Sequence, residues 1–117
     1  KAVAEGIISY IDDSLIEEFY QRVLAQQVNP GICKKSVLKV FYTPLNGAGN
    51  KPVREVLRRI GLKDVSVVPE QEKPDGNFPT CPYPNPEIRQ AFEYALKMTE
   101  KEKADLLLAT DPDCDRV

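Results

Sequence analysis

Residues 111–116 read Asp-Pro-Asp-Cys-Asp-Arg, so three carboxylates alternate over five positions near the end of the chain. Carboxylates that are crowded together repel one another and resist ionisation. A hard divalent cation such as Mg²⁺ or Ca²⁺ relieves that cost, because it takes oxygen ligands. A solvated acidic loop is the plain alternative, but the pattern directly follows an apolar run and favours a cation site at Asp111, Asp113 and Asp115. A calcium loop of the D-x-D-x-D-G type fits worse, because its sixth position holds Arg116 instead of Gly.

Arg116 adds a second chemical function to the acidic pattern. A guanidinium that is fixed beside a metal loop stays charged and can grip a phosphate through two hydrogen bonds. The alternative is an arginine that only neutralises its acidic neighbours. We predict that Arg116 contacts phosphate.

Two further loops hold residues that could belong to a site. The turn at residues 46–50, Asn-Gly-Ala-Gly-Asn, invites comparison with a phosphate cradle, but it lacks the third glycine of the dinucleotide fingerprint and the G-K-[ST] of a P-loop. We therefore expect its glycines to supply positive φ and a close strand-to-helix turn. In the later loop we expect Asp75-Gly76 to reverse the chain and Phe78 to fill the core. We expect Tyr83 to pack as an aromatic residue, with a substrate contact as the alternative.

Composition narrows the function classes. The 117 residues form one domain of ordinary size, and 42% hydrophobic with 29% charged residues is typical of a soluble globular chain. A net charge of −2 gives no basic surface for nucleic acid and no polybasic membrane patch, and no apolar stretch is long enough to cross a membrane. Three widely spaced cysteines argue against a disulfide framework or a zinc site and favour reduced thiols in a cytoplasmic protein. Because histidine is absent, chemistry would depend on carboxylates, Lys, Arg, Tyr or the backbone.

Hydrophobic periodicity predicts the elements that position these residues. Helices are expected over residues 14–27, from 50 to 60, and from 85 onward. Strands are expected over residues 36–42, 65–68 and 105–110. The first helix opens with a capping box of Ser14 and Glu17, and Gly61 is placed to stop the second. The apolar middle of the third strand predicts burial on both faces, as in a central parallel strand.

The order of these elements predicts the fold class. Strand, helix and strand at this spacing form a βαβ unit with a right-handed crossover. We therefore expect an α/β fold: a three-layer α/β/α sandwich whose small sheet is mostly parallel, although a mixed sheet is also compatible. In such sheets ligands bind beyond the carboxyl ends of the strands. The turn after the first strand and the acidic loop after the third share that edge.

Three motifs carry a resemblance to a known family. Residues 111–116 resemble the metal-binding loop of the α-D-phosphohexomutases, written D-G-D-G-D-R or D-P-D-x-D-R. Residues 43–49 are similar to the glycine-rich turn of that family, and residues 70–79 to its acidic, proline-rich loop, which continues into Pro-Asn-Pro-Glu at 84–87. The motifs occur in family order, and the resemblance covers residues 10–117. Cys114 departs from the pattern, because that position usually holds Gly or Ala.

The resemblance implies a domain organisation. These enzymes have four domains, and this chain resembles the second, metal-binding domain. Residues 1–13 would lead in from a preceding domain, and residues 14–117 would be domain II, truncated just after the metal loop. The catalytic serine and the sugar-recognition loops belong to the other domains, so the resemblance implies that this domain alone is inactive.

The resemblance also implies residue roles. Asp111, Asp113 and Asp115 would ligate Mg²⁺, and Arg116 would contact a phosphoserine of the first domain or the phosphate in transfer. The whole enzyme would be an isomerase that interconverts hexose 1-phosphate and hexose 6-phosphate, of glucose or mannose. Its partners would be the hexose phosphate substrate and the remaining domains.

Two other classes stay open. A haloacid dehalogenase-like phosphatase or phosphotransferase would use Asp111 as its nucleophile, although Asp115 stands where that family has Thr or Val. A non-catalytic binding module would bind a protein partner and would lack Mg²⁺ affinity.

Overall fold

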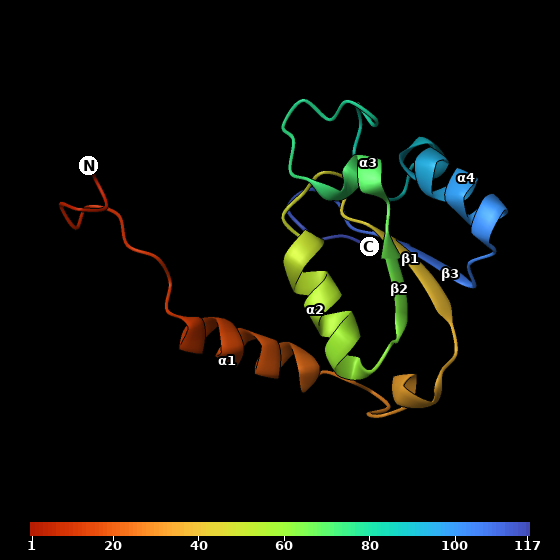
Figure 1. Cartoon of the computed structure of the whole chain (residues 1–117), viewed down its shortest axis with the longest axis horizontal. Helices are drawn as coiled ribbons and strands as arrows, with labels where there is room; N and C mark the ends of the chain where they lie inside the picture. The colour runs from red at the N-terminus through yellow and green to blue at the C-terminus, as the bar shows by residue number, and fades with distance from the viewer.

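The structure, a computed structural model that describes residues 1–117, contains one three-stranded parallel sheet (Figure 1). Its strands are β1 (Lys39–Thr43), β2 (Asp64–Val67) and β3 (Leu106–Ala109), in the spatial order β2-β1-β3. Val40 of the middle strand stands opposite Val65 on one side and Leu106 on the other. Because all three strands are parallel, their carboxyl ends meet at one edge of the sheet.

Helices cover both faces of the sheet. Figure 1 shows α2 (Asn50–Ile60) on one side and α4 (Glu93–Glu102) on the other, and the short α3 (Pro69–Glu72) follows β2. Between these layers Val40, Phe41 and Tyr42 are fully buried, as expected for β-branched and aromatic residues of a strand covered on both faces. The expected three-layer α/β/α fold is confirmed, and the sheet is parallel throughout. No helix combines the length and the apolarity needed to cross a membrane.

The expected central position of the third strand is wrong. β1 occupies the centre, whereas β3 lies at an edge and its Leu106 is 40% exposed. The prediction failed because a short apolar sequence is equally compatible with a central strand, which has a strand on each side, and with an edge strand, which has one.

Helix ends follow local chemistry, but not always at the expected residue. Gly61 ends α2 in the left-handed region with φ 102°, as predicted. The expected capping box is wrong: α1 (Asp13–Leu24) is capped by Asp12, whose carboxylate accepts the Ser14 N–H at 2.8 Å. Asn85 does accept a backbone N–H, from Glu87 at 2.9 Å.

The helix expected from Asn85 begins later. A 3-10 turn spans Arg89–Phe92, and α4 itself begins only at Glu93. The intervening Ile88 is extended, with φ −100° and ψ 123°, so the single hydrogen bond at Asn85 does not propagate into a helix.

The helix α1 lies beside α2 and buries none of its residues (Figure 1). Its apolar face stays open, with Leu15 57% and Phe19 55% exposed. Together with residues 1–12, which extend beyond it away from the sheet (Figure 1), this helix explains why the radius of gyration is 16.1 Å, although about 13 Å is typical of a compact domain of this length.

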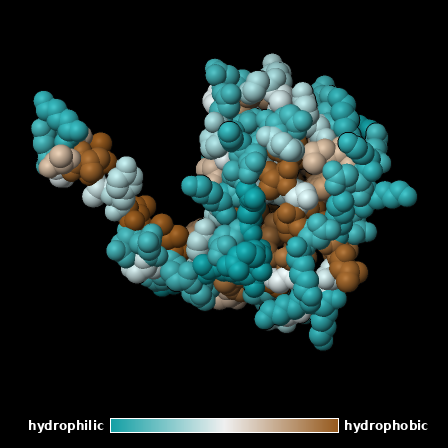
Figure 2. Space-filling model, in the orientation of Figure 1, coloured by the Kyte–Doolittle hydropathy of each residue, from teal (hydrophilic) through white to brown (hydrophobic).

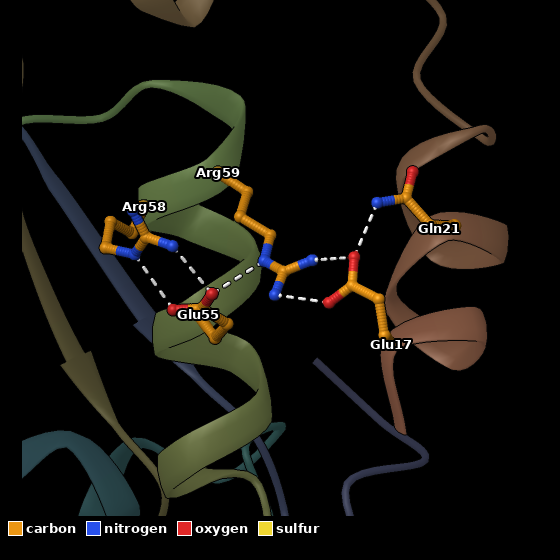
Figure 3. A network of polar contacts seen from close by, with 5 residues as sticks. All are labelled: Glu17, Gln21, Glu55, Arg58 and Arg59. Carbon is orange, nitrogen blue, oxygen red and sulfur yellow. Dashed lines mark hydrogen bonds and ion pairs between the residues drawn. The ribbon is translucent and has the colours of Figure 1, made fainter. Parts of the chain in front are cut away.

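An ion-pair network joins α1 to α2 (Figure 3). Arg59 donates to both carboxylate oxygens of Glu17, at 2.7 and 2.8 Å, and to Glu55 at 2.6 Å. Its guanidinium also lies over the Tyr20 ring, 4.6 Å from the centroid. Arg58 donates two further hydrogen bonds to Glu55. A single arginine therefore provides most of the polar contact between the two helices.

We predict that acid loosens α1 from α2. The hydrogen bonds of Arg59 and Gln21 lower the pKa of Glu17 to about 2, and those of Arg58 and Arg59 lower the pKa of Glu55 to about 2. Because both pKa values are depressed in the folded state, the stabilisation is present above the ordinary pKa of 4.5 and is lost as the pH falls toward 2. Hydrogen-exchange protection factors of α1 amides should fall over this window, ahead of those of β1.

Two variants provide the control. Arg59→Gln should give low α1 protection at every pH, because it removes the link to Glu17. Arg22→Gln breaks an ion pair with Glu18 that lies wholly within α1, so it should behave like the wild type. Equal behaviour of the two variants would contradict the prediction.

Candidate functional site

The acidic loop begins where β3 reaches the carboxyl edge of the sheet. Thr110 and Asp111 are buried, whereas Asp113 and Asp115 are exposed to solvent. The loop closes on itself, because the Cys114 N–H donates to the Asp111 carbonyl at 3.0 Å. This tight turn brings the alternating acids onto one small surface.

The Asp111 carboxylate organises the loop from the inside. Its Oδ1 accepts the backbone N–H groups of Asp115 and Arg116 at 3.0 and 3.1 Å, and its Oδ2 accepts Nε of Arg116 at 2.7 Å. Burial alone would raise the pKa of Asp111, but the backbone and side-chain hydrogen bonds of Arg116 outweigh it and hold that pKa below its usual range. Asp111 is therefore a buried carboxylate that stays ionised.

The three predicted metal ligands do come together. Asp111, Asp113 and Asp115 each present one carboxylate oxygen, and these oxygens lie within 4.8 Å of one another. Two ligands of one Mg²⁺ are at most about 4.2 Å apart, since each stands about 2.1 Å from the ion. Neighbouring ligands of an octahedral ion stand closer, about 3 Å apart, so the side chains of the exposed Asp113 and Asp115 would have to turn inward to suit the set to a hard cation.

The crowding of the three carboxylates affects the pKa of Asp115. A hydrogen bond with Asp111, together with repulsion from Asp111 and Asp113, raises the pKa of Asp115. A cation among the three oxygens would relieve this repulsion. The donor set thus fits a divalent cation, and the binding itself stays a prediction.

Arg116 makes the neutralising contact that the sequence left as an alternative. Its Nε lies 2.7 Å from Asp111 and 3.5 Å from Asp115, and this pairing raises the pKa of Arg116. The side chain is half exposed, and the structure records no hydrogen bond from its two Nη groups. Those groups remain free to bind an anion, so the predicted phosphate contact is compatible with the geometry.

The glycine turn packs directly against the acidic loop. A Cβ on Gly47 would stand 2.3 Å from Cα of Pro112, and one on Gly49 would stand 2.7 Å from Oγ1 of Thr110. The Ala48 N–H donates to the Pro112 carbonyl at 2.8 Å. Close approach, and not phosphate binding, accounts for these glycines.

The expected positive φ at the glycines is wrong. The left-handed residues of this turn are Leu45, with φ 47°, and Asn46, with φ 60°. Asn46 tolerates that region because its side chain can form local hydrogen bonds, and here its Nδ2 donates to the Lys73 carbonyl at 2.8 Å. The left-handed conformation therefore lies at the two residues before Gly47, and the Asn46 hydrogen bond ties the turn to the loop after α3.

Two buried polar contacts beneath the site went unnoticed in the sequence. The hydroxyls of Tyr42 and Thr110 are 2.8 Å apart across the ends of β1 and β3, and burial raises the pKa of Tyr42 to about 12. Gln71 is fully buried, accepting from Thr43 at 2.7 Å and donating to Thr80 at 3.1 Å. These contacts could have been inferred from Thr43 and Thr110, the polar residues at the ends of β1 and β3, because these strand ends lie at the edge where ligands bind.

The proline-rich loop faces the acidic loop across an open pocket of about 440 Å³. Asp75 turns the chain as expected, accepting the Asn77 N–H at 2.9 Å. Two expectations here are wrong: Phe78 is only half-buried, with φ 45°, and Tyr83 is 76% exposed. The cause is the proline-rich path between them, which keeps both rings on the loop and outside the core.

Comparison with known proteins decides the family. The family described as "Phosphoglucomutase/phosphomannomutase, alpha/beta/alpha domain II" matches residues 17–117. This chain belongs to that family. Among curated relatives it is similar to a phosphoribomutase of Saccharomyces cerevisiae, with 34% identity over 99% of this chain and 20% of that protein. It is also similar to a phosphoglucomutase of Staphylococcus aureus (strain MRSA252), with 40% identity over 74% of the chain and 16% of that protein.

The match has consequences for the open alternatives. A phosphomannomutase of Mycoplasmoides pirum is 28% identical over 96% of the chain and 21% of its own length, so the chain spans about a fifth of these relatives. No solved structure matches the chain. Membership in the mutase family is incompatible with the haloacid dehalogenase-like alternative.

We predict that Gly47→Ala destabilises this domain. The added Cβ would overlap the Pro112 backbone, which cannot move as a flexible side chain would. Overpacking of this kind typically costs about 1–3 kcal/mol, so the urea midpoint should fall. Gly76→Ala is the matched control, because a Cβ there meets no atom within 4 Å. Equal midpoints for the two variants would refute the close-approach explanation.

Proposed function

We propose that this chain is the Mg²⁺-binding domain of a cytoplasmic phosphohexomutase that interconverts hexose 1-phosphate and hexose 6-phosphate through a phosphoserine on another domain. The observation that carries the proposal is the set of three carboxylate oxygens within 4.8 Å of one another, at the carboxyl edge of the sheet. The family match and the mutase names of the relatives support the reaction class.

The three acids would divide the work of holding the ion. Asp113 and Asp115 are exposed and can turn toward a cation with little cost, whereas Asp111 is fixed by its hydrogen bonds. Oδ2 of Asp111 accepts only one hydrogen bond, so a lone pair is left for a metal. When bound, Mg²⁺ neutralises charge on the phosphoryl group in transfer.

Arg116 would position the phosphate. Asp111 holds its Nε and so restrains the guanidinium, while neither Nη group makes a hydrogen bond. A planar guanidinium held in this way can bind a phosphate oxygen pair without first losing much freedom. The role we propose for Arg116 is orientation and charge neutralisation, not proton transfer.

The residues of this chain do not complete a mutase site. Phosphoryl transfer needs an acceptor and a sugar site, and the chain spans about a fifth of its relatives. We therefore propose that the remaining domains of a longer polypeptide supply the phosphoserine and the sugar contacts, and that this domain alone has no turnover.

Metal binding by the chain itself can be measured directly. We expect isothermal titration with Mg²⁺ to show binding that Asp113→Asn weakens at least about tenfold, because one of three negative ligand charges is lost. Asp64→Asn is the matched control, since Asp64 is exposed at the start of β2, where its side chain makes no hydrogen bond or ion pair. Equal affinities for the two variants would argue against this metal site.

Activity is tested in the full-length enzyme. Asp113→Asn should greatly reduce Mg²⁺-dependent turnover while the urea midpoint stays close to that of the wild type, because Asp113 is exposed. Arg116→Lys keeps the positive charge but loses the planar guanidinium that can donate two parallel hydrogen bonds to a phosphate, so it should also slow turnover. Wild-type turnover in Asp113→Asn would overturn the proposed function.

A further inference from the structure

The largest hollow of the molecule lies away from the acidic loop. It is an open groove of about 640 Å³ over α2, between α1 and the start of β2. Eight residues line it: Tyr20, Lys51, Arg54, Glu55, Arg58, Leu62, Lys63 and Val65. Four of these side chains are cationic and one is acidic, so the groove differs in sign from the metal loop.

The positive charge is concentrated by helical spacing. Lys51, Arg54 and Arg58 follow one another at intervals of three and four residues, which places them along one face of α2. They span about 10 Å along the helix axis, and Lys63 extends the row beyond the helix end. Figure 2 shows strongly hydrophilic surface over this part of the molecule.

Among the residues that line the groove, one carboxylate stands against four cations, and the exposed Asp64 lies next to Lys63 without an ion pair. Glu55 is shared, because it accepts from Arg58 at 2.7 Å and from Arg59 at 2.6 Å. Arg54 pairs with Glu72 at 2.7 Å. Lys51 and Lys63 are exposed and make no ion pair. An ordinary solvated helix face alternates its charges, whereas this groove keeps an excess of cations in a chain whose net charge is −2.

We propose that this groove binds an oligophosphate, a small ligand with at least two linked phosphate groups. Its volume falls in the range of small-molecule sites, roughly 300–1,000 Å³. The ammonium groups of Lys51 and Lys63 make no ion pair and are open to phosphate oxygens, and a row of cations about 10 Å long exceeds what a single phosphate can neutralise. Tyr20, Leu62 and Val65 add an apolar wall for an organic group attached to the phosphates. None of these residues belongs to the metal loop, so the inference is independent of the proposed function.

Pyrophosphate is the first probe, titrated into this chain without divalent cations and followed by amide NMR. Shifts should gather on residues 51–65, and affinity should fall as salt is added. Lys63→Glu should weaken binding about tenfold or more, because it replaces a charge-assisted contact with repulsion. Lys51→Glu should act in the same direction. Lys101→Glu, at an exposed position of α4 on the other face of the sheet, should leave the affinity unchanged.

A second arm distinguishes the sources of the ligand. Tighter binding of ATP than of inorganic triphosphate would identify a nucleotide that uses the apolar wall, and equal affinities would identify the phosphate chain as the whole determinant. Asp113→Asn should leave both affinities unchanged. The proposal is overturned if pyrophosphate causes no shifts at residues 51–65, if the shifts gather only on residues 111–116, or if Lys63→Glu and Lys101→Glu bind alike.

Discussion

The contact between the glycine turn and the acidic loop sets the geometry of the carboxyl edge. Gly47 lies against the Pro112 backbone so closely that a single methyl group would collide with it, and the Ala48 N–H bonds to the same residue. This contact is backbone against backbone, so it fixes the loop more firmly than side chains could. The contact thereby holds the loops that follow β1 and β3 in fixed positions, and the carboxylates of residues 111–115 are placed by the second of these loops.

A second constraint follows inside the loop, where Asp111 serves two needs at once. Its carboxylate accepts hydrogen bonds from three donors of the loop, the N–H groups of Asp115 and Arg116 and Nε of Arg116. The same hydrogen bonds keep it ionised, and an ionised carboxylate is what a hard cation requires. The fold of the loop and the proposed metal site would therefore both depend on Asp111, whereas Asp113 and Asp115 are exposed and would contribute mainly to the metal site.

The sequence predicted what local chemistry determines and missed what tertiary context determines. The stop at Gly61 follows from a short pattern and is confirmed. The three acids of residues 111–115 also follow from a short pattern and lie close together, while their binding of a metal stays a prediction. The position of β3 at the edge, the exposure of Tyr83 and the strain at Asn46 depend on which segments lie alongside. The residue types alone do not determine which segments pack against them, so these features could not be predicted from the sequence.

Cys114 illustrates how such neighbours compensate for an unfavourable residue. It adopts φ 66°, a region that costs a residue with a Cβ roughly 1–2 kcal/mol and that glycine occupies freely. Its sulfur would stand 2.9 Å from a Cβ on Gly49, so the side chain fills the space that the glycine leaves open. Packing in that space offsets part of the backbone cost. Gly49 and Cys114 thus form a matched pair: glycine at 114 would relieve the backbone strain but leave a void beside Gly49, and a side chain at 49 would displace the sulfur.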